Sequence, residues 1–201
     1  MAFVRLVFPP MTHLKIEGRH HLEGIDEPVI FIANHNSRLD PVYMVAFLPW
    51  RLYFKMMPFR FMTLGKTMRK LRSIPGLYLV GCFPVEPRNG NLESILHGSM
   101  KILNRGKNAM VMFPEKDLHK EGEPPHARPG IAYLAKHTGR LVIPVGLSGM
   151  REMGAISFWT RKTNVTMKFG KPFYYNDVAK RGEDLREVAQ KMMNKVYGLM
   201  E

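Results

Sequence analysis

The sequence contains little cysteine and no long apolar run. Cys82 is the single cysteine among 201 residues, so an internal disulfide is excluded and a reducing compartment is favoured. The longest apolar candidate, VYMVAFLPW at 42–50, has nine residues, and a membrane-spanning helix needs roughly 18. Residues 1–12 are apolar but short, and Pro9 and Pro10 interrupt them. We expect neither a secretory signal nor a membrane span. The segment 1–12 suits a membrane interface or loose packing on its own domain.

Acidic residues are also scarce. Seventeen Asp and Glu stand against 30 Lys and Arg, which gives a formal net charge of +13 at pH 7. No acidic residue occurs from Pro41 to Val85, where seven cations are interspersed with aromatic residues and methionines. Such a mixture suits an anionic lipid surface, and the alternatives are a solvated basic face or a nucleic-acid contact. The total absence of acidic residues favours the membrane over a solvated face, and we rank nucleic acid lower because no recognisable nucleic-acid-binding motif is present.

Short apolar runs alternate with helical patterns, which is typical of an α/β fold with a largely parallel sheet. Continuous apolar runs at 28–34, 109–114 and 141–147 predict buried strands, and strict alternation at 163–170 predicts a strand nearer an edge. Helical spacing predicts helices over 92–105, over 130–138 and in a C-terminal docking helix at about 183–200. We find no linker or repeat, and we predict a single domain over 1–201.

A histidine and an aspartate stand five positions apart directly after the run at 28–34. His35 should lie at the carboxyl end of a strand, where α/β sheets bind ligands. A carboxylate that holds the Nδ1–H of an imidazole leaves Nε2 free to take a proton from a hydroxyl. However, Asp40 followed by Pro41 equally suits the N-cap of a helix. The residues alone therefore fit either a general base with its orienting acid or a structural turn.

Four sequence blocks in order resemble the phospholipid/glycerol acyltransferase family, which includes the 1-acylglycerol-3-phosphate acyltransferases. NHNSRLD at 34–40 is similar to the first block, and this likeness implies that His35 is the base and Asp40 its partner. The likeness runs from about residue 14 to 173 and implies one domain with a mostly parallel mixed sheet flanked by helices. The second, third and fourth blocks correspond to GCFPVEPRN at 81–89, MFPE at 112–115 and VIPVGL at 142–147.

The resemblance implies an O-acyltransferase. His35 would take a proton from the hydroxyl of a lyso-lipid or glycerol-phosphate-type acceptor, and the oxygen would attack an acyl thioester. The donor would be acyl-CoA or acyl carrier protein. Backbone N–H groups near the turn would stabilise the oxyanion. We expect no metal or other cofactor, and the remaining histidines show no convincing metal-ligand spacing.

Two blocks depart from the family pattern. The third normally continues Glu-Gly-Thr-Arg, with an arginine that is thought to bind the acceptor phosphate, but here Lys116 follows Glu115 and that arginine is missing. In the second block, Pro87 separates an acid and an arginine that are normally adjacent. Substitute positive charge would come from Lys116 or from Arg128. The expected substrate-binding residues are Arg88, Glu115, Lys116 and Arg128.

These expectations describe a cytoplasmic enzyme that associates peripherally with an anionic membrane. Its partners would be the acyl thioester donor and the lyso-lipid acceptor, and we expect no nucleic acid. The alternative is a basic lipid- or nucleic-acid-binding module without catalysis. A changed third block also fits either a pseudoenzyme or an acyltransferase for a different acceptor, and the intact His35 and Asp40 favour the changed acceptor.

Overall fold

The structure is a computed structural model of the whole chain. The residues it describes are 13–37, 40–70, 81–86, 91–105, 109–115, 126–149 and 164–201. The apolar segment 1–12, Arg88 and Lys116 lie outside these ranges, and the first block, the second block and the stretch 41–85 lie partly outside them.

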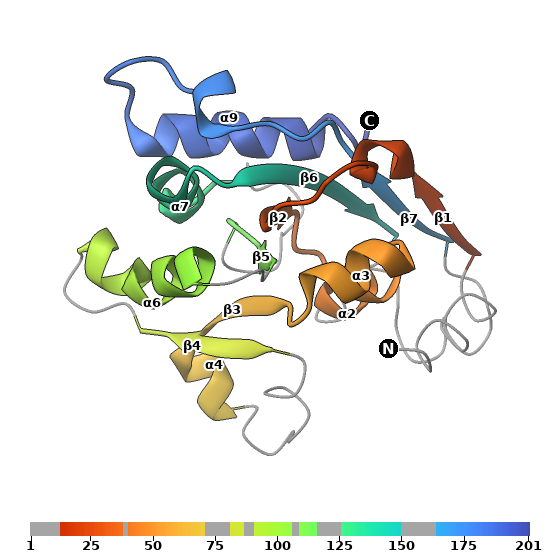
Figure 1. Cartoon of the computed structure of the whole chain (residues 1–201), viewed down its shortest axis with the longest axis horizontal. Helices are drawn as coiled ribbons and strands as arrows, with labels where there is room; N and C mark the ends of the chain where they lie inside the picture. Colours follow the sequence, from red (N-terminus) through yellow and green to blue (C-terminus); the bar gives the residue numbers. More distant parts are fainter. Residues whose placement is uncertain are drawn as a thin grey trace.

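A seven-stranded sheet organises the described residues, in the order β1-β7-β6-β2-β5-β3-β4 (Figure 1). Neighbouring strands are parallel except for β6 and β7, which are antiparallel. The predicted α/β fold with a mostly parallel mixed sheet is therefore confirmed. The strands are β1 (His13–Glu17), β2 (Val29–Ala33), β3 (Arg60–Leu64), β4 (Cys82–Val85), β5 (Met110–Met112), β6 (Leu141–Ser148) and β7 (Asn164–Phe169).

Helices connect the strands, and in the described ranges none is long and apolar enough to cross a membrane. They are η1 (Arg19–Leu22), α2 (Asp40–Ala46), α3 (Trp50–Met56), α4 (Gly65–Lys70), α6 (Leu92–Arg105), α7 (Gly130–Thr138), η2 (Tyr175–Asp177) and α9 (Leu185–Tyr197). The sequence analysis located α2, α6, α7 and α9, and the strands β2, β5, β6 and β7. It did not identify α3, β1 or β3.

β2 is buried on both faces, which explains its unbroken apolar run. Successive side chains of a strand point to opposite faces. Accordingly, Phe31 and Ala33 pack in one core with α2 and α3, whereas Ile30 and Ile32 pack in a second core with α6, α7 and α9. Figure 1 shows these two groups of helices on opposite sides of the sheet. β2 is the central strand of the sheet. The residues that follow it therefore lie in the middle of the edge formed by the carboxyl ends of the parallel strands.

α9 docks firmly on the second core. Asp184 caps its N-terminus, where the carboxylate accepts a hydrogen bond from the Arg186 N–H at 2.8 Å. One stripe of the helix is completely buried, and it consists of Val188, Ala189, Met192, Met193 and Val196. Figure 1 shows α9 running alongside α7 and β6. The last residue of the helix, Tyr197, therefore has a well-supported position.

Candidate active site

The segments that follow β2 and β5 meet at the carboxyl edge of the sheet. The two strands are parallel neighbours, and Ile32 is paired with Met112. Three residues further on, the same register brings His35 beside Glu115. The backbone N–H of His35 donates a hydrogen bond to Oε2 of Glu115 at 2.8 Å. The predicted location of His35 at the end of a strand is confirmed.

The structure brings the side chains of His35 and Asp40 together. Nδ1 of His35 lies 3.0 Å from Oδ2 of Asp40. An ionised carboxylate can only accept, so Nδ1 carries the proton and Nε2 retains its lone pair. The His35 side chain is 20% exposed, whereas that of Asp40 is completely buried. This arrangement gives an imidazole of fixed tautomer whose second nitrogen can serve as a base.

The carboxylate of Asp40 is directed at the loop that precedes α2. Oδ2 also accepts the backbone N–H groups of Asn36 and Ser37, each at 2.7 Å. Oδ1 is buried and has no hydrogen-bond partner among the residues that the structure describes. The Asp40 N–H closes the turn by donating to the Ser37 carbonyl at 3.1 Å. Asp40 thus orients the imidazole and also shapes the backbone of residues 34–37, which we call the histidine loop.

Phe113 holds the face of the His35 ring. The two ring centroids are 4.5 Å apart, and the planes are inclined by 30°. Such stacking restricts rotation of the imidazole about its side-chain torsions. Sequence analysis did not select Phe113. The only signal was its place directly after β5, which is the parallel neighbour of β2.

Glu115 bridges His35 to the C-terminal helix. While Oε2 accepts the His35 N–H, Oε1 accepts the hydroxyl of Tyr197 at 2.6 Å. Burial above all, followed by the hydrogen bond to Glu115 and the charge of that carboxylate, raises the pKa of Tyr197 far above its ordinary value. Tyr197 is therefore a permanent donor at physiological pH. Sequence analysis did not select this residue.

The end of β2 is tied to β6 by the side chain of Asn34. Its Nδ2 donates to the Leu147 carbonyl at 2.7 Å, and its Oδ1 accepts the Leu147 N–H at 2.8 Å. Nδ2 of Asn36 reaches the same carbonyl at 3.1 Å. Asn34 is buried and replaces the backbone pairing that ends at Ala33 and Val145. Both residues that flank His35 are thus anchored.

The remaining predicted substrate-binding residues have different positions. Arg128 is exposed, and its backbone N–H donates to the Pro114 carbonyl at 2.9 Å, which places it beside the Glu115 segment. Arg88 and Lys116 lie outside the described residues. The acid of the second block, Glu86, forms an exposed ion pair with Arg69 at 2.7 Å.

The backbone N–H groups of residues 35–37 in the histidine loop are already occupied. The N–H groups of His35, Asn36 and Ser37 point to the carboxylates of Glu115 and Asp40. These three groups therefore do not act as the oxyanion donors expected near this turn. Among the residues that the structure describes, no group of three or more His, Cys, Asp and Glu side chains could hold a metal ion.

The central strand of a largely parallel sheet ends at a histidine whose Nδ1 lies beside a buried aspartate, and this geometry leaves the second ring nitrogen without that partner. A model of the Acyltransferase family matches residues 13–148, which is more than half of the chain. The chain therefore belongs to the Acyltransferase family, and the predicted family is confirmed.

Two relatives are similar to this chain in sequence. The 1-acyl-sn-glycerol-3-phosphate acyltransferase of Streptococcus pneumoniae (strain ATCC BAA-255 / R6) is 27% identical over 180 residues, covering 88% of this chain and 62% of that protein. The chloroplastic 1-acyl-sn-glycerol-3-phosphate acyltransferase LPAT1 of Arabidopsis thaliana is 27% identical over 143 residues, covering 70% and 37%. The chain thus spans less than two thirds of the length of either relative.

The fold is shared with a solved structure. The crystal structure of the 1-acyl-sn-glycerophosphate (LPA) acyltransferase PlsC from Thermotoga maritima superposes with a TM-score of 0.67. The match covers 98% of this chain and 79% of that chain at 18% sequence identity. At this level of identity the likeness supports the fold and says nothing further about the reaction.

Proposed function

We propose that the protein is an O-acyltransferase that moves an acyl group from a thioester to the hydroxyl of a lyso-lipid or glycerol-phosphate-type acceptor. The observation that carries this proposal is the 3.0 Å contact between His35 Nδ1 and the buried Asp40 carboxylate. Membership of the Acyltransferase family and two relatives named as 1-acyl-sn-glycerol-3-phosphate acyltransferases support it.

The proposed reaction is a direct transfer. Nε2 of His35 takes the proton of the acceptor hydroxyl while its oxygen attacks the thioester carbonyl carbon. The C–S bond of the resulting tetrahedral intermediate then breaks, and the departing thiolate receives the proton from the imidazolium. Asp40 stabilises that imidazolium through Nδ1. The acceptor supplies its own nucleophile, so the reaction requires no serine and no metal or other cofactor. The donor is acyl-CoA or acyl carrier protein.

Arg128 is the residue that we propose binds the phosphate of the acceptor. The third block lacks the arginine that the family pattern would supply, and Arg128 is an exposed cation joined by its backbone to Pro114, next to Glu115. A guanidinium binds phosphate in a bidentate manner, which favours Arg128 over a lysine for this task. Arg88 and Lys116 remain proposed contributors. The two carboxylate oxygens of Glu115 accept the His35 N–H and the Tyr197 hydroxyl, so we propose that Glu115 supports the site through His35.

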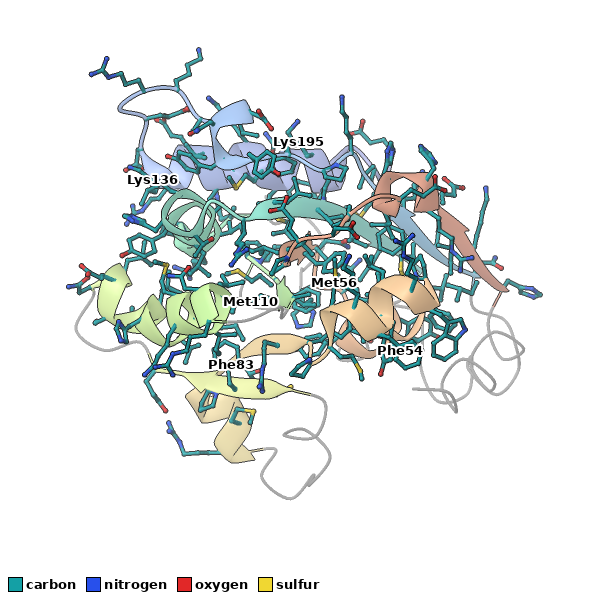
Figure 2. All side chains as sticks on the ribbon, in the orientation of Figure 1. Phe54, Met56, Phe83, Met110, Lys136 and Lys195 are labelled. Atoms are coloured by element: carbon teal, nitrogen blue, oxygen red, sulfur yellow. The ribbon has the colours of Figure 1, made fainter. Side chains whose placement is uncertain are left out.

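We propose that the protein attaches peripherally to anionic membranes from the cytoplasmic side through α3. Trp50, Phe54 and Met57 are 47%, 64% and 44% exposed, and the rings of Trp50 and Phe54 stack with centroids 5.6 Å apart. Figure 2 shows Phe54 on the outer side of α3, whereas Met56 of the same helix points toward the sheet. Exposed Arg51 adds positive charge beside the rings. Aromatic residues flanked by cations suit the headgroup boundary of anionic lipids.

The experiment for the activity offers the purified protein a mixture of lyso-lipids with either acyl-CoA or acyl carrier protein thioesters. Products are identified by mass spectrometry. We expect one acceptor class to gain one acyl chain with release of one equivalent of free thiol. Thiol release without any acylated lipid would contradict transfer and would indicate hydrolysis.

A further inference from the structure

Tyr197 connects the C-terminal helix to the histidine loop through a single carboxylate. Its hydroxyl donates to Oε1 of Glu115 at 2.6 Å, and Oε2 of the same carboxylate accepts the His35 N–H at 2.8 Å. These two contacts join residues separated by 82 and 80 positions in the chain. A hydroxyl on α9 thus lies two hydrogen bonds away from the backbone of the candidate base.

The bridge has firm supports at both ends. Tyr197 is the last residue of α9, whose buried stripe ends at Val196 directly before it. Glu115 follows β5, which is completely buried in the centre of the sheet. A hydroxyl that donates to a carboxylate forms one of the stronger kinds of hydrogen bond, and this one is half-buried from water. The hydrogen bonds of Glu115 therefore couple the position of the histidine loop to that of α9.

The bridge completes a three-point hold on His35. Asp40 fixes Nδ1, Phe113 fixes the ring face, and Glu115 fixes the backbone N–H. The first two contacts hold the ring, and the side chains of Asn34 and Asn36 anchor the neighbouring residues to Leu147. The third contact holds the backbone N–H of His35 itself, and it does so only while the Glu115 carboxylate keeps its orientation, which Tyr197 supports from the opposite oxygen.

We propose that Tyr197 is a positioning residue for His35, acting through Glu115. This inference rests on the proposed function, because it concerns how the base is placed for proton transfer. A catalytic group displaced by a fraction of an ångström loses much of its rate advantage, so loss of the hydroxyl lowers kcat by about tenfold. Tyr197 does not touch the substrates in this account, and KM is therefore unchanged.

The test compares Tyr197→Phe with Tyr133→Phe. Tyr133 is a matched control, because it is a helical, partly buried tyrosine of α7, and its ring packs on His137 with centroids 4.3 Å apart. Steady-state kinetics give kcat and KM for both substrates, and amide hydrogen exchange of His35 is followed by NMR on ¹⁵N-labelled protein. We expect Tyr197→Phe to lower kcat, leave both KM values unchanged and speed exchange of the His35 amide. Tyr133→Phe should match the wild type in all three.

A third variant tests the route through Glu115. In a Glu115→Ala background neither His35 nor Tyr197 has a carboxylate to contact, so adding Tyr197→Phe should change kcat by less than about twofold. Losses that multiply would show that Tyr197 acts independently and would overturn the route. Wild-type kcat in Tyr197→Phe would likewise overturn the proposal.

The failure of this inference is distinguishable from failure of the proposed function. Unchanged exchange of the His35 amide in Tyr197→Phe overturns the inference whatever the activity. A wild-type protein that transfers no acyl group contradicts the proposed function instead. Equal losses of kcat and of thermal stability in both tyrosine variants would reduce Tyr197 to a packing residue and would also overturn the inference.

Discussion

The side-chain amide of Asn34 satisfies both backbone polar groups of Leu147, 113 residues away. This pairing closes the end of β2 against β6 at the point from which the histidine loop departs. We expect Asn34→Ala to lower the free energy of unfolding by about 2 kcal/mol, because it leaves the buried Leu147 N–H without a partner. Urea denaturation of wild type and variant measures the difference.

Asn36 offers a matched control for this prediction. It is partly exposed, and its side-chain amide donates to the Leu147 carbonyl, which Asn34 also satisfies. Asn36→Ala should therefore cost less than half as much as Asn34→Ala. Equal costs for the two variants would mean that the end of β2 is held against β6 by packing rather than by the Asn34 amide.

Replacement of Asp40 separates its two roles. We expect Asp40→Asn to lower kcat by about 10²- to 10⁴-fold, because an amide neither fixes the Nδ1–H tautomer nor stabilises an imidazolium. Steady-state kinetics at saturating substrates measure this loss. A variant with wild-type kcat and reduced thermal stability would restrict Asp40 to shaping the loop and the start of α2.

Stability at alkaline pH reports on Tyr197. The pKa of this group is raised in the folded state by burial and by Glu115, so the folded protein favours the protonated phenol. Its contribution is fully present below the unfolded value of about 10 and is lost as the pH rises above it. We expect the melting temperature of the wild type to fall more steeply between pH 9 and about pH 11 than that of Tyr197→Phe. Parallel falls would contradict this linkage.

Arg128→Ala tests whether Arg128 binds the phosphate of the acceptor. Loss of a charge-assisted hydrogen bond to phosphate should raise KM for a phosphate-bearing acceptor about tenfold and leave kcat unchanged. The control is Arg186→Ala, which removes an exposed cation on α9. If both variants raise KM alike, the effect is a general loss of charge. If neither does, the phosphate contact belongs elsewhere in the chain.

The membrane face is tested at Phe54. We expect Phe54→Ser to weaken binding to anionic vesicles about tenfold, since the exposed ring would otherwise enter the headgroup boundary. Met200→Ser, at a residue 36% exposed beyond the end of α9, is the control and should bind as the wild type does. Co-sedimentation across a salt series measures both, and a single-stranded oligonucleotide serves as the competing polyanion. Tighter binding to the oligonucleotide than to vesicles would contradict membrane attachment.

The elements that sequence analysis located are those with a strong local pattern. β2 shows a continuous apolar run because both of its faces are buried, and α9 shows a stripe because one side of it docks. α3 was missed because Trp50 and Phe54 expose apolar side chains, which obscures the contrast between faces that marks a surface helix. β3 was missed because it begins at Arg60, between aromatic residues, and so looks like the rest of the basic stretch from 41 to 85.

The residues of the site likewise differ in whether a local sequence pattern marks them. His35 and Asp40 are five residues apart, so a local motif sufficed to select them. The contact between His35 and Glu115 depends on the register of β2 against β5, which no single segment encodes. Tyr197 depends in addition on how α9 docks, and its sequence context contains no sign of the glutamate that it contacts.

The rate of acyl transfer by His35→Ala tests the central claim most directly. The account predicts that removing the imidazole lowers kcat at least about a thousandfold, with an unchanged far-ultraviolet spectrum and thermal stability close to the wild type. Purified His35→Ala that consumes thioester and forms acylated acceptor at the wild-type rate would contradict it.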